Sequence, residues 1–261
     1  MNIQYCSDLH IEFPKNKAFL KETPIQAIGD ILIIAGDLVP FTIMDKHSYF
    51  FKFCADNFEQ TYWIPGNHEY YGFDVTQKCG TFHEKIKSNV HLLNNTTIEI
   101  NNIALIFTTL WSKINPAHQW EIERGMNDFH VIKYGKYRFS LDRFNELHQE
   151  NLQFLTAALN ENQHIKRVVT THHVPTLQHY PKQYIGSLLN DAFAVELDDF
   201  IKQHQPDYWI YGHHHQNTPE FKIGKTTLLT NQLGYVEMSE HLNFETNKTI
   251  NMNYLQELGL N

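Results

Sequence analysis

Five short apolar runs in the chain each stop at polar or turn residues. Continuous apolar runs of this length are typical of β-strands that are buried on both faces. In an α/β protein built on such strands, ligand-binding residues collect outside the carboxyl ends of the strands. The sequence therefore predicts an α/β fold with its chemistry at one edge of a sheet. The runs are residues 1–6, 31–35, 61–64, 167–170 and 208–211.

Other patterns predict helices and hairpins around these strands. Apolar residues recur every three or four positions over residues 140–159, which predicts an amphipathic helix with Ser140 as its N-cap. Residues 50–58 and 193–204 are also expected to be helical, with Asp191 as a candidate cap for the second. Asn101-Asn102 and Gly224-Lys225 are hairpin turn signals. They predict the pairs 98–100/104–109 and 221–223/226–229, which would contribute to a second sheet.

Two long segments, residues 112–139 and 174–190, lack a clear period and are expected to be irregular. Both combine aromatic and polar side chains, and long loops in compact domains are often functional. We expect them to form the rim of a substrate site. Glu69, Tyr70 and Tyr71 have two open interpretations, a place at that mouth or simple packing, while Asp128 is expected to order the loop around it.

The polar residues after the apolar runs carry carboxylate, amide and imidazole groups, which together suit transition metals such as Mn, Fe or Zn. In an extended chain, residues two apart point to one side, so each pair in an Asp-x-His or His-x-His block is expected to reach one region. Glycines precede three of the blocks, where the backbone would turn sharply and pass close to bound ions. The blocks are Asp8-Leu9-His10, Gly36-Asp37, Gly66-Asn67-His68-Glu69, Thr171-His172-His173 and Gly212-His213-His214-His215.

This ordered series resembles the calcineurin-like metallophosphoesterase superfamily, in particular its small bacterial phosphoesterase and phosphodiesterase branch. The resemblance implies a four-layer α/β/β/α sandwich of two mixed β-sheets flanked by helices, which holds two divalent transition-metal ions. It implies that His68 acts on the phosphoryl group or protonates the leaving oxygen without binding metal. His172 is preferred to His173 as a ligand, and His214 is expected to face away. The implied metal ligands are Asp8, His10 and His215 for one ion, Asp37 for both, and Asn67, His172 and His213 for the other.

The resemblance and the two ions imply hydrolysis of small phosphodiesters or phosphomonoesters by attack of a metal-bound hydroxide. The Asp-Arg-Gly block of Ser/Thr protein phosphatases is absent after Asp37, and no arginine occurs before Arg124. Because arginine is the favoured side chain for bidentate phosphate recognition, this argues against a protein phosphatase. A nuclease of the same superfamily and a non-catalytic binding scaffold with this fold are the alternatives.

Composition narrows the setting. A chain of 261 residues fits a single domain over 1–261, and its net charge of −8 disfavours nonspecific nucleic-acid binding. No window approaches the roughly 20 apolar residues of a spanning helix, so no membrane association is expected. The first strand begins at once, which predicts no signal peptide. Three cysteines without a CxxC motif fit a reducing compartment, so a cytoplasmic location is expected.

Overall fold

A first six-stranded sheet contains the strands that precede the first three polar blocks. The computed structural model describes residues 1–252, and the strand order is β14-β1-β2-β3-β5-β4. Strands β1, β2, β3 and β5 are parallel, whereas β14 and β4 are antiparallel edges. The bounds are Asn2–Cys6 for β1, Ile31–Ala35 for β2, Gln60–Ile64 for β3, Phe82–Lys87 for β4, Val90–Asn94 for β5 and Thr249–Asn251 for β14.

A second six-stranded sheet has the order β12-β13-β11-β10-β7-β6. Its four central strands are parallel and its two edges, β12 and β6, are antiparallel, so both sheets are mixed. The bounds are Thr96–Ile100 for β6, Ile103–Phe107 for β7, Lys166–Thr170 for β10, Tyr208–Tyr211 for β11, Phe221–Ile223 for β12 and Thr226–Thr230 for β13; β8 (Lys133–Tyr134) and β9 (Tyr137–Arg138) form a separate hairpin.

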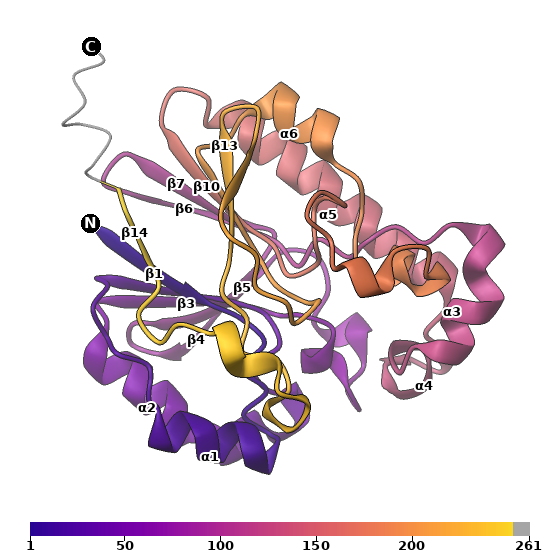
Figure 1. Cartoon of the computed structure of the whole chain (residues 1–261), viewed down its shortest axis with the longest axis horizontal. Helices are drawn as coiled ribbons and strands as arrows, with labels where there is room; N and C mark the ends of the chain where they lie inside the picture. The colour runs from indigo at the N-terminus through magenta and orange to yellow at the C-terminus, as the bar shows by residue number, and fades with distance from the viewer. Residues whose placement is uncertain (253–261) are drawn as a thin grey trace.

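Helices cover the outer faces of the two sheets (Figure 1). Helices α1 and α2 lie on the side of the first sheet, and α5 and α6 lie on the side of the second. The α-helices are α1 Pro14–Glu22, α2 Ser48–Asn57, α3 Gln119–Gly125, α4 Asp128–Val131, α5 Leu141–Glu161 and α6 Asp198–His204. The short 3-10 helices are η1 Phe41–His47, η2 His68–Tyr70, η3 Val75–Gln77, η4 Pro116–His118, η5 Lys182–Tyr184, η6 Leu188–Ala192, η7 Val236–Met238 and η8 Glu240–Asn243.

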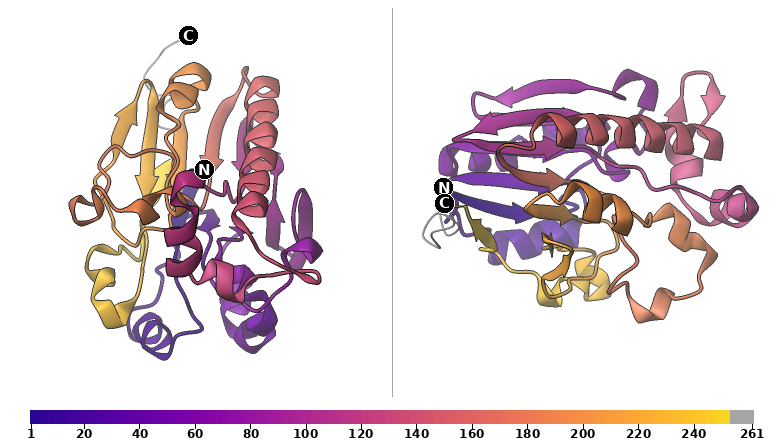
Figure 2. Two further views of the ribbon diagram at one scale, coloured as in Figure 1. Left: turned by 90° about the vertical axis from the view of Figure 1, so that its right-hand side faces the viewer. Right: turned by 90° about the horizontal axis from the view of Figure 1, so that it is seen from above.

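The alternating side chains of β2 explain why its sequence is apolar throughout. Ile31 and Ile33 face the second sheet, where they join a core that includes Phe107 and Ile210. Leu32 and Ile34 belong instead to the core beneath α2. Each face of the strand is therefore covered by protein, which is why the hydrophobic run is continuous. The sheets lie face to face between helical layers (Figure 2), so the predicted four-layer sandwich is confirmed.

Most predicted elements are confirmed, with one helix wrong in its first half. Ser140 caps α5 by accepting a hydrogen bond from the backbone N–H of Arg143, and both hairpins form. The predicted helix 193–204 begins only at Asp198, and the candidate cap Asp191 does not cap it. Ala194 instead forms an isolated parallel bridge with Val174, which donates its N–H to the Phe193 carbonyl and accepts from the Val195 N–H. A helix that began at residue 193 would need the Phe193 carbonyl and the Leu197 N–H for its first hydrogen bond, but these groups bond Val174 and the Pro175 carbonyl.

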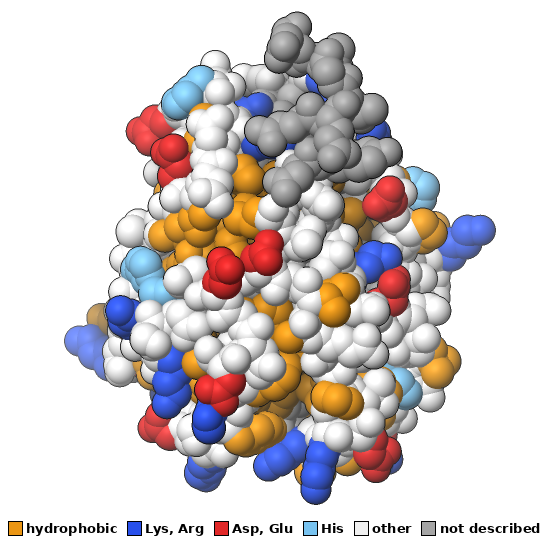
Figure 3. Space-filling model, turned by 90° about the vertical axis from the view of Figure 1, so that its left-hand side faces the viewer, with side chains coloured by type: hydrophobic (Ala, Val, Ile, Leu, Met, Phe, Trp, Pro, Cys, Tyr) orange, Lys and Arg blue, Asp and Glu red, His pale blue; other side chains and the backbone are white. Residues whose placement is uncertain are grey.

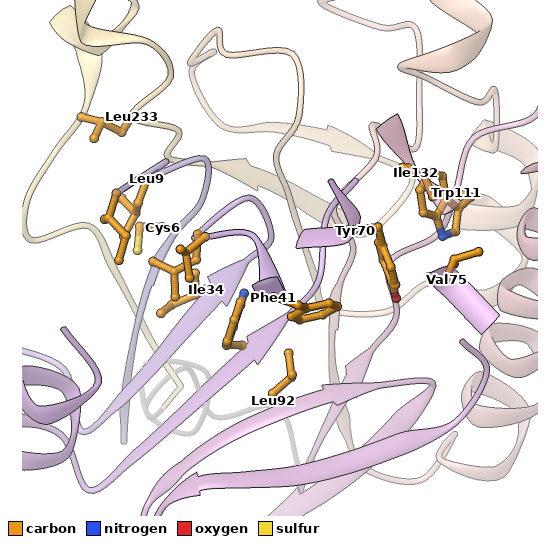
Figure 4. Packing of buried hydrophobic residues seen from close by; sticks show 14 of the residues in the cluster. Cys6, Leu9, Ile34, Phe41, Tyr70, Val75, Leu92, Trp111, Ile132 and Leu233 are labelled. Atoms are coloured by element: carbon orange, nitrogen blue, oxygen red, sulfur yellow. The ribbon is translucent and has the colours of Figure 1, made fainter. Parts of the chain in front are cut away.

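The segment 112–139 is more regular than expected, because it contains α3, α4 and the β8–β9 hairpin. It is fixed to the rest of the molecule by buried side chains. Figure 4 shows Trp111 and Ile132 close to Tyr70 and Val75 in one hydrophobic cluster. Within the segment, Phe139 is buried in the same cluster, and its ring centroid lies 5.7 Å from that of Trp111. The rim predicted on this segment therefore rests on the core and has a defined shape.

Within residues 1–252, no helix is long and apolar enough to cross a membrane. The face of the molecule drawn in Figure 3 carries Lys and Arg interspersed with Asp and Glu. The expected single domain over 1–261 stays a prediction, and its last nine positions, 253–261, lie outside the described residues.

Candidate metal centre

The polar blocks meet at one edge of the two sheets. Parallel strands present their carboxyl ends on the same side, and the two sheets face each other, so the residues after β1, β2, β3, β10 and β11 converge. All seven residues predicted as ligands lie in this cluster, and six of them are buried, with His215 nearly so. They are Asp8, His10, Asp37, Asn67, His172, His213 and His215.

Asp37 stands between two sets of side chains. Its Oδ2 lies 3.7 Å from His10 Nε2, while its Oδ1 lies 3.4 Å from His172 Nε2. Ligand atoms of Asp8, His10, Asp37 and His215 come within 4.8 Å of one another, as do those of Asp37, His172 and His213. One carboxylate thus contributes an oxygen to each of two potential ion sites.

The four histidines of these sets point their inner ring nitrogens at each other in pairs. His10 Nε2 lies 3.1 Å from His215 Nε2, and His172 Nε2 lies 3.1 Å from His213 Nδ1. Two nitrogens at this distance can share only one proton. The arrangement is better satisfied by a cation between them, because neutral imidazole presents a lone pair to a metal.

The outer ring nitrogen of each histidine is held by an acceptor. His10 Nδ1 donates to Glu12 Oε1 at 3.3 Å, and His215 Nδ1 donates to Glu240 Oε2 at 2.7 Å. His172 Nδ1 lies 2.9 Å from the Ala35 carbonyl, and His213 Nε2 lies 3.4 Å from that of Ala192. Metal-binding histidines show this pattern, since the outer acceptor fixes the tautomer and leaves the inner lone pair for the ion.

Asn67 is oriented by a residue far from it in the sequence. Its side-chain Nδ2 donates to Asp128 Oδ1 at 2.9 Å, which leaves its Oδ1 facing His172 Nε2 at 3.2 Å. The Tyr71 hydroxyl also donates to Asp128 Oδ1, at 2.8 Å. Asp128, which was expected only to order its own loop, therefore selects the flip state that turns the amide oxygen of Asn67 toward the cluster.

The backbone of the cluster is left-handed at five non-glycine positions. The φ angles are 55° at Asp8, 44° at His10, 52° at Asp37, 83° at His213 and 53° at His215. This conformation costs an L-residue about 1–2 kcal/mol, and such strain concentrates at functional sites. It also corrects the expectation that these pairs project from extended chain. Asp8 and His10 do share one set, but the left-handed turns bring them there, and His213 and His215 fall in different sets.

Three glycines allow the strand ends to approach the polar cluster. A Cβ at Gly36 would lie 2.3 Å from His172 Nδ1, and one at Gly212 would lie 2.6 Å from Asp8 Oδ2. At Gly66 it would lie 2.2 Å from Asp37 Oδ1 and 2.6 Å from His172 Nε2. The backbone therefore passes close to the polar side chains of the cluster at all three glycines, as predicted.

Gly66→Ala is expected to weaken metal binding about 10–100-fold, comparable to the loss of an outer partner of a metal ligand. The new methyl group would occupy space held by Asp37 and His172, while the backbone at Gly66 does not have the left-handed φ that alanine resists. Metal titration of folded protein measures the effect. Gly125→Ala is the control, because its Cβ would meet only the flexible end of Leu189 at 3.1 Å. Equal affinities in both variants would contradict the close approach at Gly66.

The electrostatics of the cluster favour a cation. Burial alone would lower the pKa of His172, but Asp37 and Asp8 outweigh it and raise that pKa to about 9. Burial likewise opposes protonation of His215, yet hydrogen bonds to Asp8 and Glu240 raise its pKa to about 10. Burial would raise the pKa of Asp37, but His172 and His68 hold it well below its usual range. The same negative potential would attract a divalent ion, so the donor set fits metal binding in charge as well as geometry.

His68 lies at the edge of the cluster and lines a cavity of about 340 Å³. Its ring stacks on Tyr71 with centroids 4.1 Å apart, and its Nε2 is 3.3 Å from the Tyr235 hydroxyl. Its backbone N–H donates to Asp37 Oδ1 at 3.0 Å. Burial would lower the pKa of His68, but the carboxylates of Asp37 and Glu12 raise it. His68 also shares a third set with His10 and Glu12, whose ligand atoms lie within 4.8 Å of one another.

Glu69, whose role was left open, lies beneath the cluster and away from the mouth. It is fully buried and accepts backbone N–H bonds from Asp37 at 3.0 Å, from Leu38 at 2.7 Å and from Gly66 at 2.6 Å, as well as the indole N–H of Trp63 at 3.2 Å. Its carboxylate therefore ties the turn after β2 to the turn after β3. Tyr70 is buried in the core, whereas Tyr71 lines the cavity.

His173 and His214, the two histidines of these blocks that were not expected to bind metal, lie outside the sets that contain Asp37. His173 is fully buried and packs against Trp111, with ring centroids 5.2 Å apart, whereas its neighbour His172 enters the cluster. His214 accepts from or donates to the Gln232 side chain through Nδ1, at 2.9–3.3 Å, and its ring lies 5.8 Å from that of Tyr211. His214 therefore faces away from Asp8 and His10 and lines the cavity wall instead.

Sequence reasoning missed the two carboxylates that hold the outer nitrogens of His10 and His215. The sequence offered a signal for Glu12, because Asp8, His10 and Glu12 are polar residues spaced two apart. Glu240 gave none, since it is 25 residues from His215 and lies in η8.

Comparison with known proteins agrees with this geometry. A model of the family described as calcineurin-like phosphoesterase matches residues 1–217. The chain belongs to this family. It is 30% identical over 271 residues to the uncharacterized protein L509 of Acanthamoeba polyphaga mimivirus, covering 92% of this chain and 94% of that protein. The structure of a phosphopantetheinyl hydrolase from Mycobacterium tuberculosis is similar with a TM-score of 0.69 and 14% identity, over 97% of both chains.

Membership of the calcineurin-like phosphoesterase family makes the protein a metal-dependent phosphoester hydrolase. The matched range contains every polar block at the two sheet edges, from Asp8 to His215. Outside it lie Gln232, Tyr235 and Glu240, the partners of His214, His68 and His215.

Proposed function

We propose that this protein is a single-domain, dinuclear phosphoesterase that hydrolyses small phosphodiesters or phosphomonoesters. Asp8, His10 and His215 would bind one ion, and Asn67, His172 and His213 the other. Asp37 would bridge them. Manganese, iron and zinc all suit this mixture of carboxylate, amide and imidazole donors.

The observation that carries the proposal is the orientation of the four histidines. Each outer nitrogen meets an acceptor, and the inner nitrogens converge in two pairs on either side of Asp37. In each pair the two imidazole nitrogens are 3.1 Å apart. Binding of one cation by both nitrogens explains this distance better than a hydrogen bond between them does. The complete set of donors also weighs against the alternative of a binding scaffold.

The residues of the chain would then divide the work of hydrolysis. When bound, two divalent ions lower the pKa of water and offset the charge of a phosphoryl group. Glu12, Glu240 and Asp128 hold His10, His215 and Asn67 in their binding orientations. His68 faces the cavity with its pKa raised and is proposed to give a proton to the leaving oxygen.

The cavity beside the cluster supports a small substrate. It measures about 340 Å³, and its wall includes Tyr71, Tyr180, Tyr184 and Phe193. A volume of this size accommodates a ligand of nucleotide size or smaller and excludes a folded protein surface. The aromatic rings offer faces against which a flat group can pack. The proposed partner is therefore a small phosphoester, and neither a nucleic acid nor a membrane is proposed as a partner. The proposed location is the cytoplasm.

A substrate panel with the Mn-, Fe- and Zn-loaded protein tests this function. We expect kcat/KM for p-nitrophenyl phosphate, bis(p-nitrophenyl) phosphate or a phosphopantetheinyl ester to exceed that for a phosphopeptide, because only the small esters fit the cavity. The phosphopantetheinyl ester belongs in the panel because a protein of similar structure is named as its hydrolase. A phosphopeptide turned over fastest would restore the protein phosphatase interpretation. Fastest cleavage of DNA would favour the nuclease alternative.

A further inference from the structure

The candidate centre opens onto a second, smaller compartment. A cavity of about 220 Å³ lies next to the main one, and the two share part of their walls. A substrate phosphorus bound at the centre would therefore have space on two sides. The shared residues are Tyr184, His214, His215 and Glu240.

The two compartments differ in chemistry. Beyond the cluster, the main cavity has several apolar and aromatic side chains in its wall, among them Met126, Tyr180, Leu189 and Phe193. The polar residues Asn127, Ser187 and Asn190 also line it. The smaller cavity has four side-chain amides in its wall, beside the apolar Met238 and Leu242. The amides belong to Gln183, Gln216, Asn217 and Asn243.

Three of these amides are available to a ligand. Gln183 comes from η5, Gln216 follows His215 and Asn243 ends η8, and all three are exposed. Within residues 1–252, none of the three side-chain amides makes a hydrogen bond to the protein. Each offers two N–H donors and one carbonyl acceptor, which complement hydroxyl and carbonyl groups of a neutral polar molecule.

Charge restricts the substrate further. Among the described residues that line the two cavities there is no lysine or arginine, and Glu240 stands at their junction. A phosphomonoester has a second pKa of about 6 and is close to a dianion at neutral pH, whereas a phosphodiester is a monoanion. The single negative charge of a diester needs less neutralisation by the protein than the charge of a monoester does. An additional phosphate on either arm would meet no cationic side chain.

We propose that the preferred substrate is a phosphodiester with one apolar or aromatic arm and one neutral polar arm. The apolar arm would occupy the main cavity and the polar arm the smaller cavity, with the phosphorus between them at the centre. This inference rests on the proposed function and narrows it from phosphoesters in general to asymmetric, singly charged diesters.

Three diesters with one leaving group test the assignment, all measured with Mn-loaded enzyme. They are methyl p-nitrophenyl phosphate, the p-nitrophenyl ester of thymidine 5′-monophosphate, and the same ester with a 3′-phosphate on the sugar. We expect kcat/KM for the thymidine ester to exceed that for the methyl ester at least tenfold, because the nucleoside adds a sugar hydroxyl and the carbonyl groups of the base for the amides. The 3′-phosphate is expected to remove that advantage.

Variants locate the effect. Gln183→Trp and Leu242→Trp would each narrow the smaller cavity, and we expect each to reduce the thymidine-to-methyl ratio at least fivefold. Gln163→Trp is the matched control, since Gln163 is exposed in the turn after α5 and lines neither cavity. This control is expected to leave the ratio unchanged.

The outcomes separate the inference from the function on which it rests. Three results would overturn the assignment of the polar arm to the smaller cavity. They are a thymidine-to-methyl ratio of kcat/KM near one, a 3′-phosphate that raises kcat/KM, and a ratio that neither tryptophan variant changes. Hydrolysis of p-nitrophenyl phosphate together with no diester would also overturn it, while leaving a phosphoesterase in place. A folded, metal-loaded protein that hydrolyses none of these esters, the monoester included, would instead refute the proposed function.

Discussion

Asp37→Ala is expected to lose most of the bound metal and nearly all hydrolytic activity. Asp37 is the one residue of the cluster that places an oxygen near each of the two sets, at 3.7 Å from His10 Nε2 and 3.4 Å from His172 Nε2. Loss of an outer partner of a metal ligand costs about 10–100-fold in metal affinity or activity. Removal of a ligand proposed for both ions is expected to exceed that range.

Metal content and turnover should be measured on the same samples. We expect about two ions per chain in the wild type, as in two-metal hydrolases, and fewer than one in the variant. Because Asp37 Oδ1 also accepts the His68 N–H, thermal unfolding must show that the variant is folded. Asp199→Ala is the control for loss of one acidic charge, since that side chain is fully exposed. Full metal loading of folded Asp37→Ala would refute the bridging role.

The parts of the fold that depend on local pattern could be predicted from the sequence. Strand β2 has the predicted bounds because its residues must pack against both the second sheet and α2. The residue types after the strands were sufficient to select the cluster, since parallel strand ends meet at one edge. Choosing His172 over His173 needed the family resemblance, because both follow the same strand.

The interactions that orient the cluster could not be predicted, because they join segments distant in sequence. Asp128 is 61 residues from the Asn67 amide that it turns. Glu240 reaches His215 from η8, a segment whose polar sequence has no helical or strand period. The start of α6 was missed for a similar reason: the pattern of residues 193–197 fits a helix, but hydrogen bonds to Val174 and Pro175 occupy backbone groups that its first turn would need.

Backbone strain explains a second kind of failure. Alternation along an extended chain was the only local rule available for Asp8 and His10, and it assumed negative φ angles. The structure instead uses left-handed turns at both residues. Such turns are unfavourable for non-glycine residues, so a sequence rule based on propensity does not choose them. They persist where surrounding contacts fix them, and here Asp8 and His10 donate their N–H groups to the carbonyls of Gly36 and Asp37.

His68→Ala is expected to keep both ions and to lose roughly 10²–10⁴-fold in kcat, the usual contribution of a positioned general acid. His68 lies outside the two sets that contain Asp37, and its ring lines the cavity, stacked on Tyr71. Its backbone N–H, which bonds Asp37, is retained in the alanine variant. Metal content should therefore match that of the control His164→Ala, an exposed histidine in the turn after α5.

The dependence on leaving group distinguishes proton donation by His68 from a merely structural role. Phenolate is a poorer leaving group than p-nitrophenolate, so its departure depends more on a proton. The loss in kcat should therefore be larger for phenyl esters than for p-nitrophenyl esters. Equal losses for the two leaving groups would indicate that His68 positions the phosphoryl group instead of protonating the product. The set formed by His10, Glu12 and His68 defines the alternative, in which His68 binds a metal ion. If the variant emptied the centre, His68 would be a metal ligand and His10 would bind through its Nδ1 side, where Glu12 now lies at 3.3 Å.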